Sequence, residues 1–169
     1  MTTATMTPES SDRSKPWSAT RAILVGGVAA AIGDFVAAMT IWSVNWITIG
    51  HAIAAGWLGK AAARTSGVPG ALLGVASHTG ILLVAAALYV VASRRFPILN
   101  RAPLVTGPLY GLAIFMVMTF VVVPLSATAR PDGPMGRLQP RLDNILDLGS
   151  HLFLVGLPIA LAAWKARRR

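Results

Sequence analysis

The chain has no cysteine, few charged residues and only six acidic ones among its 169 residues. Without cysteine, neither a disulfide framework nor a thiolate metal site can form. Charged residues make up 12% of the sequence and hydrophobic ones 54%, which leaves too little charge to cover a soluble domain of this length. The low content of charged residues favours a protein that is embedded in the lipid bilayer.

The sequence also lacks the short motifs of common enzymes. It has no G-x-S-x-G, no H-E-x-x-H, no Walker loop and no glycine-rich turn after a strand. Ser77 directly precedes His78, but adjacent helical residues point about 100° apart, so the two form a poor nucleophile–base pair. The sequence therefore favours a protein that is not an enzyme, with an enzyme acting on lipid or quinone as a minor alternative.

Four apolar stretches are each long enough to cross a hydrocarbon core of about 30 Å at about 1.5 Å per helical residue. They cover roughly residues 22–46, 71–93, 103–127 and 145–163. We therefore predict an all-α integral membrane protein, a four-transmembrane-helix bundle formed by a single domain over residues 21–169. Residues 1–20 are polar and rich in serine and threonine, and are expected to form a disordered cytoplasmic tail.

Basic residues are unevenly divided between the two sides of such a bundle. Ten lie before the first span, between the second and third, and after the fourth, whereas five lie in the other two connections. The positive-inside rule therefore predicts that both termini are cytoplasmic. This distribution accounts for the net charge of +9, and no basic stretch with interleaved aromatics points to nucleic acid.

The connection at residues 47–64 has a weak helical periodicity. Ile49, Ile53 and Trp57 recur at every fourth position, whereas Lys60 and Arg64 return to the same face at its far end. We expect one extra amphipathic helix on the outer side, which either lies in the membrane interface or dips into the membrane as a re-entrant turn.

Asp34 lies near the centre of the first span, where an ionised carboxylate costs about 2.5–3.5 kcal/mol. It must therefore be protonated, paired or hydrated. Asn45 follows about three turns later, and Gly27 and Ala30 precede Asp34 at helical spacing, so this small, polar face is expected to point into the bundle. One interpretation is a single interhelical hydrogen bond from a neutral carboxyl, and the other is a functional proton or cation site.

Histidines in the second and fourth spans form a second candidate site. His78 and His151 lie at a similar depth, about 10 Å from the outer ends of spans that run in the same direction, so they could face each other. Asn144, Asp147 and His151 share one helical face, which brings the Asp147 carboxylate next to the imidazole. Three interpretations stay open: a hydrogen-bonded pair between helices, a proton relay or cation site, and haem ligation. No metal site is predicted, because further ligands at a characteristic spacing are absent from the sequence.

Glycines and prolines in the spans predict how the helices pack. Two pairs of glycines four residues apart would let neighbouring helices approach closely. The pairs are Gly70 with Gly74 and Gly107 with Gly111. Pro124 and Pro158 are expected to kink or loosen the third and fourth spans, because proline cannot donate to the helical hydrogen-bond ladder.

Several of these positions together resemble the YagU-like family of small bacterial inner-membrane proteins. The resemblance rests on His78, Tyr89, Phe96 followed by Pro97, Gly107, Gly111, Pro124, and Asp147 four residues before His151. It extends from Ser77 to the C-terminus and more loosely over the first span. It implies a four-span protein of the bacterial inner membrane and brings no established biochemical activity with it.

The sequence narrows the function to a short list. We favour a small membrane protein that acts through contacts between helices or subunits, as a homo-oligomer or in a larger complex, with a polar cluster near the outer leaflet. The alternative is a proton-linked or small-solute transporter or channel whose path is lined by Asp34, His78, Asp147 and His151. A bundle this small would have to oligomerise to enclose a wide channel. A haem- or metal-binding membrane subunit is the second alternative.

Overall fold

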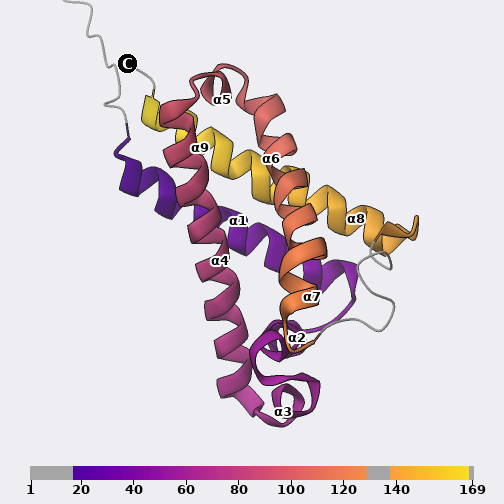
Figure 1. Cartoon of the computed structure of the whole chain (residues 1–169). Coiled ribbons are helices and arrows are strands. Elements are labelled where there is room, and N and C mark those ends of the chain that lie inside the picture. Colours follow the sequence, from indigo (N-terminus) through magenta and orange to yellow (C-terminus); the bar gives the residue numbers. More distant parts are fainter. Residues whose placement is uncertain (1–16, 129–137, 168–169) are drawn as a thin grey trace, which may run out of the picture.

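The computed structural model describes residues 17–128 and 138–167, which form a bundle of helices (Figure 1). Within these ranges, four helical segments are long and apolar enough to cross a membrane. They are Ala19–Ile41, Gly67–Arg95, Pro103–Leu125 and Leu142–Arg167. The predicted all-α bundle of four spans is confirmed. The predicted tail up to residue 16, and part of the connection between the third and fourth spans, lie outside the described residues.

The first span is the single helix α1 (Ala19–Ile41). It begins where the Ser18 hydroxyl accepts a hydrogen bond from the Arg21 backbone N–H, the usual role of serine before a helix. It ends at Ile41 rather than at Trp46 as predicted, because the chain turns at Ser43, which has a positive φ of 50°.

The segment after α1 is two short helices and not the one helix predicted for residues 47–64. These are α2 (Trp46–Leu58) and α3 (Lys60–Thr65), separated by Gly59, whose φ of 78° interrupts the helical backbone. A Cβ on Gly50 would collide with the Ala71 backbone, and the Trp57 indole donates to the Ser77 hydroxyl. The α2 helix therefore packs along the first half of α4 (Gly67–Arg95), which is the second span.

The third span is made of α6 (Pro103–Val117), the π-helical segment η1 (Met118–Val122) and α7 (Val123–Leu125). It is joined to α4 by the short helix α5 (Ile98–Arg101). The fourth span is made of α8 (Leu142–Ser150), the π-helical segment η3 (His151–Gly156) and α9 (Leu157–Arg167).

Both π-helical segments end immediately before the prolines that were expected to loosen these spans. Pro124 follows η1 and Pro158 follows η3 with one residue between. A proline has no N–H to donate four residues back, so the hydrogen-bond ladder shifts its register around it. At the end of η1, for example, the Val123 N–H donates to the Met118 carbonyl, five residues back. Both spans thus widen ahead of their prolines, and the third span ends one residue after Pro124, whereas the fourth continues to Arg167.

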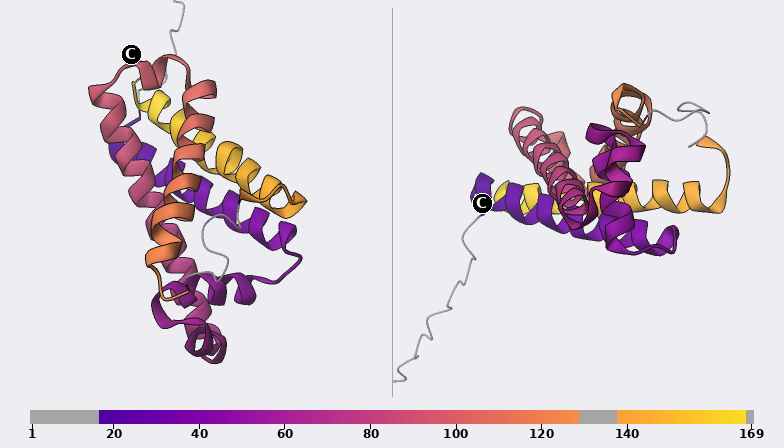
Figure 2. Two further views of the ribbon diagram at one scale, coloured as in Figure 1. Left: turned by 45° about the vertical axis from the view of Figure 1, so that its right-hand side comes forward. Right: turned by 90° about the horizontal axis from the view of Figure 1, so that it is seen from below.

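The first and fourth spans lie side by side and run in opposite directions (Figure 2). The Trp17 N–H donates to the Lys165 carbonyl at one end, and a Cβ on Gly26 would contact Ile159 and Ala162 further along. The α4 helix packs on α1, with Gly27 against Leu83. Small residues thus set the helix–helix distances on both sides of α1.

The third span packs on the fourth through direct backbone contact. A Cβ on Gly111 would collide with the His151 carbonyl, and one on Gly156 would collide with the Gly107 carbonyl. The predicted close approach at Gly107 and Gly111 is confirmed. In the other pair Gly74 lies directly against the Gly50 backbone of α2, whereas a Cβ on Gly70 would collide with Ser66 and would only touch His51 of α2.

Large apolar side chains cover the outside of the bundle, whereas small ones fill its centre. Alanine is the commonest residue of the main buried cluster, and exposed large residues occur on every span, including Leu24, Val84, Leu109 and Phe153. This inside-out distribution suits helices that face lipid and approach each other closely.

Candidate functional site

Five polar side chains meet between the first, second and fourth spans. They are Asp34 of α1, His78 of α4, Asp147 and Ser150 of α8, and His151 at the start of η3. We call this group the Asp34 cluster. Its members are largely enclosed: the exposed fractions are 13% for the Asp34 side chain and 14% for the His78 side chain, and those from the fourth span are lower still.

The Asp34 carboxylate connects the members of the cluster, because it lies near groups from two other spans. Its Oδ2 lies 3.9 Å from Nε2 of His78, and its Oδ1 lies 3.6 Å from Nδ1 of His151. The same Oδ1 accepts a hydrogen bond of 2.9 Å from the Ser150 hydroxyl. A second carboxylate oxygen, Oδ1 of Asp147, lies 3.7 Å from Nδ1 of His151. Three spans are thus linked through one aspartate.

Both imidazoles are held by backbone carbonyls. His78 Nε2 lies 3.2 Å from the Ala31 oxygen, and His151 Nδ1 lies 2.9 Å from the Asp147 oxygen, four residues earlier in its own span. A carbonyl oxygen can only accept, so each of these nitrogens must carry a hydrogen. The geometry therefore fixes the tautomer of each neutral ring, with the N–H group directed at the carbonyl and close to Asp34.

Aromatic rings stand beside both imidazoles. Phe35 of α1 packs against His78 with ring centroids 5.7 Å apart, and Phe115 of α6 meets His151 edge-on at 5.3 Å. Phe115 is fully buried. These apolar neighbours lower the local polarity around the cluster, which strengthens the electrostatic interactions inside it.

The π-helical segment η3 begins at His151, within the cluster. Because Gly111 of α6 rests on the His151 carbonyl, the third span is packed directly against this widened turn. Short π-helical segments often occur at functional sites. Here the segment allows the fourth span to hold Asp147, Ser150 and His151 against α1 while it makes backbone contact with α6.

The four ionisable residues singled out in the sequence are brought together by the structure. The sequence did not predict a direct contact between Asp34 and the histidines, and the structure places Asp34 between them. Ser150 was missed, although its position three residues after Asp147 places it on the same helical face. The serine hydroxyl on the helical face that carries Asp147 was the sequence signal that could have identified Ser150.

Of the two asparagines predicted to support the site, Asn45 lies elsewhere, whereas Asn144 lies on α8 three residues before Asp147. Asn45 was expected on the inner face of the first span, but it lies beyond the end of α1 and is exposed. Its side chain accepts a hydrogen bond from the Thr48 N–H at the start of α2. Asn144 is buried at the start of α8, where its side chain donates to the Gln139 carbonyl. Both therefore have local capping contacts near helix starts.

Metal or haem ligation gains no support from this geometry. Over residues 17–128 and 138–167, no group of three or more His, Asp or Glu side chains could hold a metal ion. The imidazole nitrogens nearest Asp34 both carry hydrogens bonded to carbonyl oxygens.

Comparisons with protein-family models, with curated proteins and with solved structures found no match to this chain.

Proposed function

We propose that this chain is a small integral membrane protein that acts through contacts between its helices or with other subunits, and that protonation of the Asp34 cluster controls those contacts. The observation that carries the proposal is the position of the Asp34 carboxylate, within 4 Å of imidazoles from two other spans. Ionisable residues within a membrane span are rare, and by default they mark proton or ion sites.

The hydrogen bonds around Ser150 can satisfy both protonation states of Asp34. When the carboxylate is ionised, the Ser150 hydroxyl donates to it. When Asp34 carries a proton, its O–H can donate to the Ser150 oxygen, and that hydroxyl can turn toward the Asp147 carbonyl, which lies 2.9 Å away. One rotating hydroxyl therefore accommodates the change without leaving a buried polar group unpaired.

The charges of the cluster also favour a role for protons. With both carboxylates ionised and both imidazoles neutral, the four ionisable groups carry two negative charges. Uptake of a proton by Asp34 or by either histidine changes the charge of the cluster, and a change of charge inside the bundle alters the interactions among the buried groups. Because these groups belong to three different spans, the change in charge acts on the packing between spans.

A proton-linked transporter or channel is the second candidate, favoured by the arrangement of carboxylates and imidazoles across three spans. The cavity that reaches the cluster is small for a solute path. It occupies about 170 Å³ between α1 and α4, and its lining is apolar apart from His78 and Thr79. We therefore rank transport below control of helix contacts.

We propose that the protein is located in the bacterial inner membrane, with both termini cytoplasmic. We also propose that it is related to the YagU-like family. The ten-to-five distribution of basic residues supports this orientation. The start of α1 lies beside the end of α9, as the hydrogen bond from Trp17 to Lys165 requires. Both ends of the bundle domain are thus on one side.

Infrared spectroscopy of the reconstituted protein tests the proton site directly. A protonated carboxyl has its own carbonyl band, which should change in intensity as the pH is varied. The Asp34→Asn variant should lose this change, whereas the exposed Val36→Leu variant on α1 should keep it. A spectrum without any pH-dependent carboxyl band from Asp34 would rule out the proposal.

A proton-flux measurement in vesicles separates the two candidates. Control of helix contacts predicts pH-dependent assembly or packing without sustained flux. Proton flux that follows a pH gradient and disappears in Asp34→Asn would assign the chain to transport instead.

A further inference from the structure

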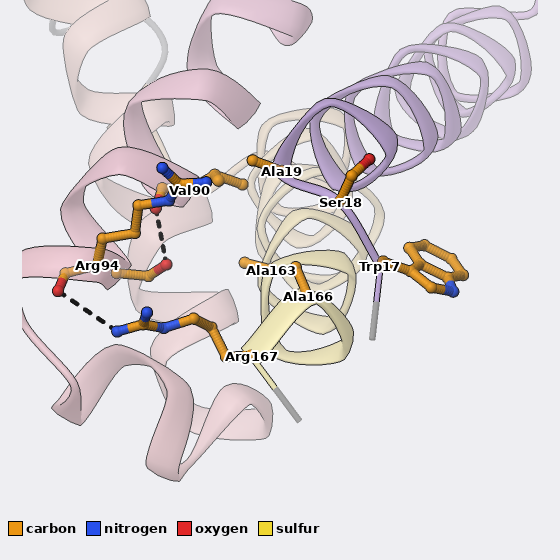
Figure 3. Close-up of a pocket in the computed structure, with 9 residues that line it drawn as sticks. Trp17, Ser18, Ala19, Val90, Arg94, Ala163, Ala166 and Arg167 are labelled. Carbon is orange, nitrogen blue, oxygen red and sulfur yellow. Dashed lines mark hydrogen bonds between the residues drawn. The ribbon is translucent and has the colours of Figure 1, made fainter. Parts of the chain in front are cut away.

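A cavity of about 390 Å³ lies where α1 begins and α4 and α9 end (Figure 3). This end of the bundle is opposite α2 and α3 (Figure 1). Its walls include Ser18 at the start of α1, Ser93 and Arg94 of α4, and Arg167 of α9. Three of the four spans therefore contribute to it. It is distant in sequence from every member of the Asp34 cluster.

Two guanidinium groups make this cavity positively charged. Figure 3 shows the Arg167 side chain directed from the end of α9 toward α4, where it donates to the Arg94 carbonyl over 3.4 Å. This single long bond leaves most of the Arg167 N–H donors free to bind a ligand. Within the described residues, no hydrogen bond or ion pair engages the Arg94 guanidinium.

Carboxylates that could neutralise these arginines are absent from this end of the described chain. The acidic residues in the described ranges are Asp34, Asp143 and Asp147, and the ion pairs that they form with other described residues involve His78, His151 and Arg141. The start of α1 adds a partial positive charge, because the first N–H groups of a helix lack partners within it. The cavity thus combines arginine side chains, a serine hydroxyl and a helix start, which are the groups that bind phosphate.

Trp17 indicates where this end of the bundle lies relative to the membrane. The Arg21 guanidinium lies 4.6 Å from the centroid of its ring and the Lys165 ammonium lies 5.0 Å from it. Tryptophan side chains gather at the membrane–water interface, where lipid headgroups lie. A basic pocket between transmembrane helices at that level is suited to an anionic lipid headgroup.

We propose that this cavity binds the phosphate of an anionic phospholipid headgroup, with Arg94 and Arg167 as the residues that hold it. The guanidinium groups donate to the phosphate oxygens, and the acyl chains lie along exposed apolar side chains of α4 such as Leu88 and Val91. The site joins the ends of the second and fourth spans to the start of the first, so a bound lipid would hold three spans together.

The test uses the full chain reconstituted into phosphatidylcholine vesicles that contain spin-labelled phosphatidylglycerol. The wild-type protein should immobilise the labelled anionic lipid in preference to labelled phosphatidylcholine. In Arg94→Gln/Arg167→Gln this preference should fall by about tenfold or more, since each arginine near an anionic surface contributes appreciably to binding. The matched control Lys60→Gln/Arg64→Gln removes the same charge from α3 at the other end and should keep the preference.

Three outcomes would overturn the proposal. One is an undiminished preference in Arg94→Gln/Arg167→Gln, and another is an equal loss in the α3 control, which would indicate general surface charge. The third is a wild-type protein that binds inorganic phosphate but immobilises labelled phosphatidylglycerol no more than labelled phosphatidylcholine, which would assign the cavity to free phosphate. Should the double variant not reconstitute, the single variants Arg94→Gln and Arg167→Gln replace it, and each should lower the preference whereas Lys60→Gln should not.

Discussion

The Ser150 hydroxyl donates a hydrogen bond of 2.9 Å to the Asp34 carboxylate and thereby joins the fourth span to the first. The same hydroxyl lies 2.9 Å from the Asp147 carbonyl. A hydroxyl has a single hydrogen, so it can donate to only one of these oxygens at a time. The protonation state of Asp34 therefore decides which oxygen the Ser150 hydroxyl donates to at the contact between the two spans.

Ser150→Ala should destabilise the protein by about 1–2 kcal/mol, because the buried carboxylate of Asp34 loses a hydrogen-bond donor. Thermal or denaturant unfolding in detergent measures the change. Thr40→Ala is the matched control, since the exposed Thr40 hydroxyl bonds only to the Val36 carbonyl of its own helix. An equally small effect of both substitutions would mean that the bond between Ser150 and Asp34 contributes nothing to stability.

Asp34→Leu should weaken the bundle by about 1–3 kcal/mol, because the larger apolar side chain must fit among polar groups and removes an interhelical hydrogen bond. Asp34→Asn should retain most of the stability, since the amide still accepts from Ser150. Val36→Leu on the exposed face of α1 serves as the control. A rise in the thermal stability of Asp34→Leu, with assembly intact, would show that neither the fold nor the function needs Asp34.

The two histidines should be energetically coupled through Asp34 rather than directly. A double-mutant cycle of His78→Ala and His151→Ala should give an interaction energy of about 0.5–3 kcal/mol, as is typical within one polar network. The coupling should differ between about pH 5 and about pH 8, on either side of the usual titration of imidazole.

Repeating this cycle in the Asp34→Asn background tests whether Asp34 transmits the coupling between the two histidines. The coupling should shrink there, because His78 and His151 each face the carboxylate. Additive effects at both pH values would argue against a shared cluster. Coupling that is present but unaffected by pH would identify the histidines as structural contacts only.

Gly111→Ala should destabilise the protein by about 1–3 kcal/mol, because the added Cβ collides with the His151 carbonyl and forces the third span away from η3. Gly149→Ala provides a stringent control, as no atom lies within 4 Å of a Cβ at that position. It should be neutral, or stabilising by up to about 1 kcal/mol through its helix propensity. Similar effects of the two substitutions would contradict the backbone contact.

The absence of native cysteine allows the orientation to be tested with single introduced thiols. Ala127→Cys after α7 should react with a membrane-impermeant reagent in intact cells, whereas Arg101→Cys in α5 should react only after permeabilisation. Both positions are exposed. The reverse labelling pattern would place the termini outside and contradict the orientation that the positive-inside rule predicts.

The sequence by itself determined the number and approximate limits of the spans. Hydropathy and length are local properties, and a run of about 20 apolar residues is sufficient to indicate a crossing helix. The sequence also marked Asp34 as a residue that must face inward, and it placed Asp147 one turn before His151. Both conclusions follow from the cost of a charge in lipid and from the spacing of the α-helix.

Only the tertiary structure decided which of these residues meet. Asp34 lies between His78 and His151 because α1 packs against both α4 and the fourth span, with small residues such as Gly26 and Gly27 at the contacts. Choice of neighbours depends on the fit between distant surfaces, which no local pattern specifies. Asn45 does not lie at the predicted site, because a turn at Ser43 ends α1 and makes Asn45 the cap of α2.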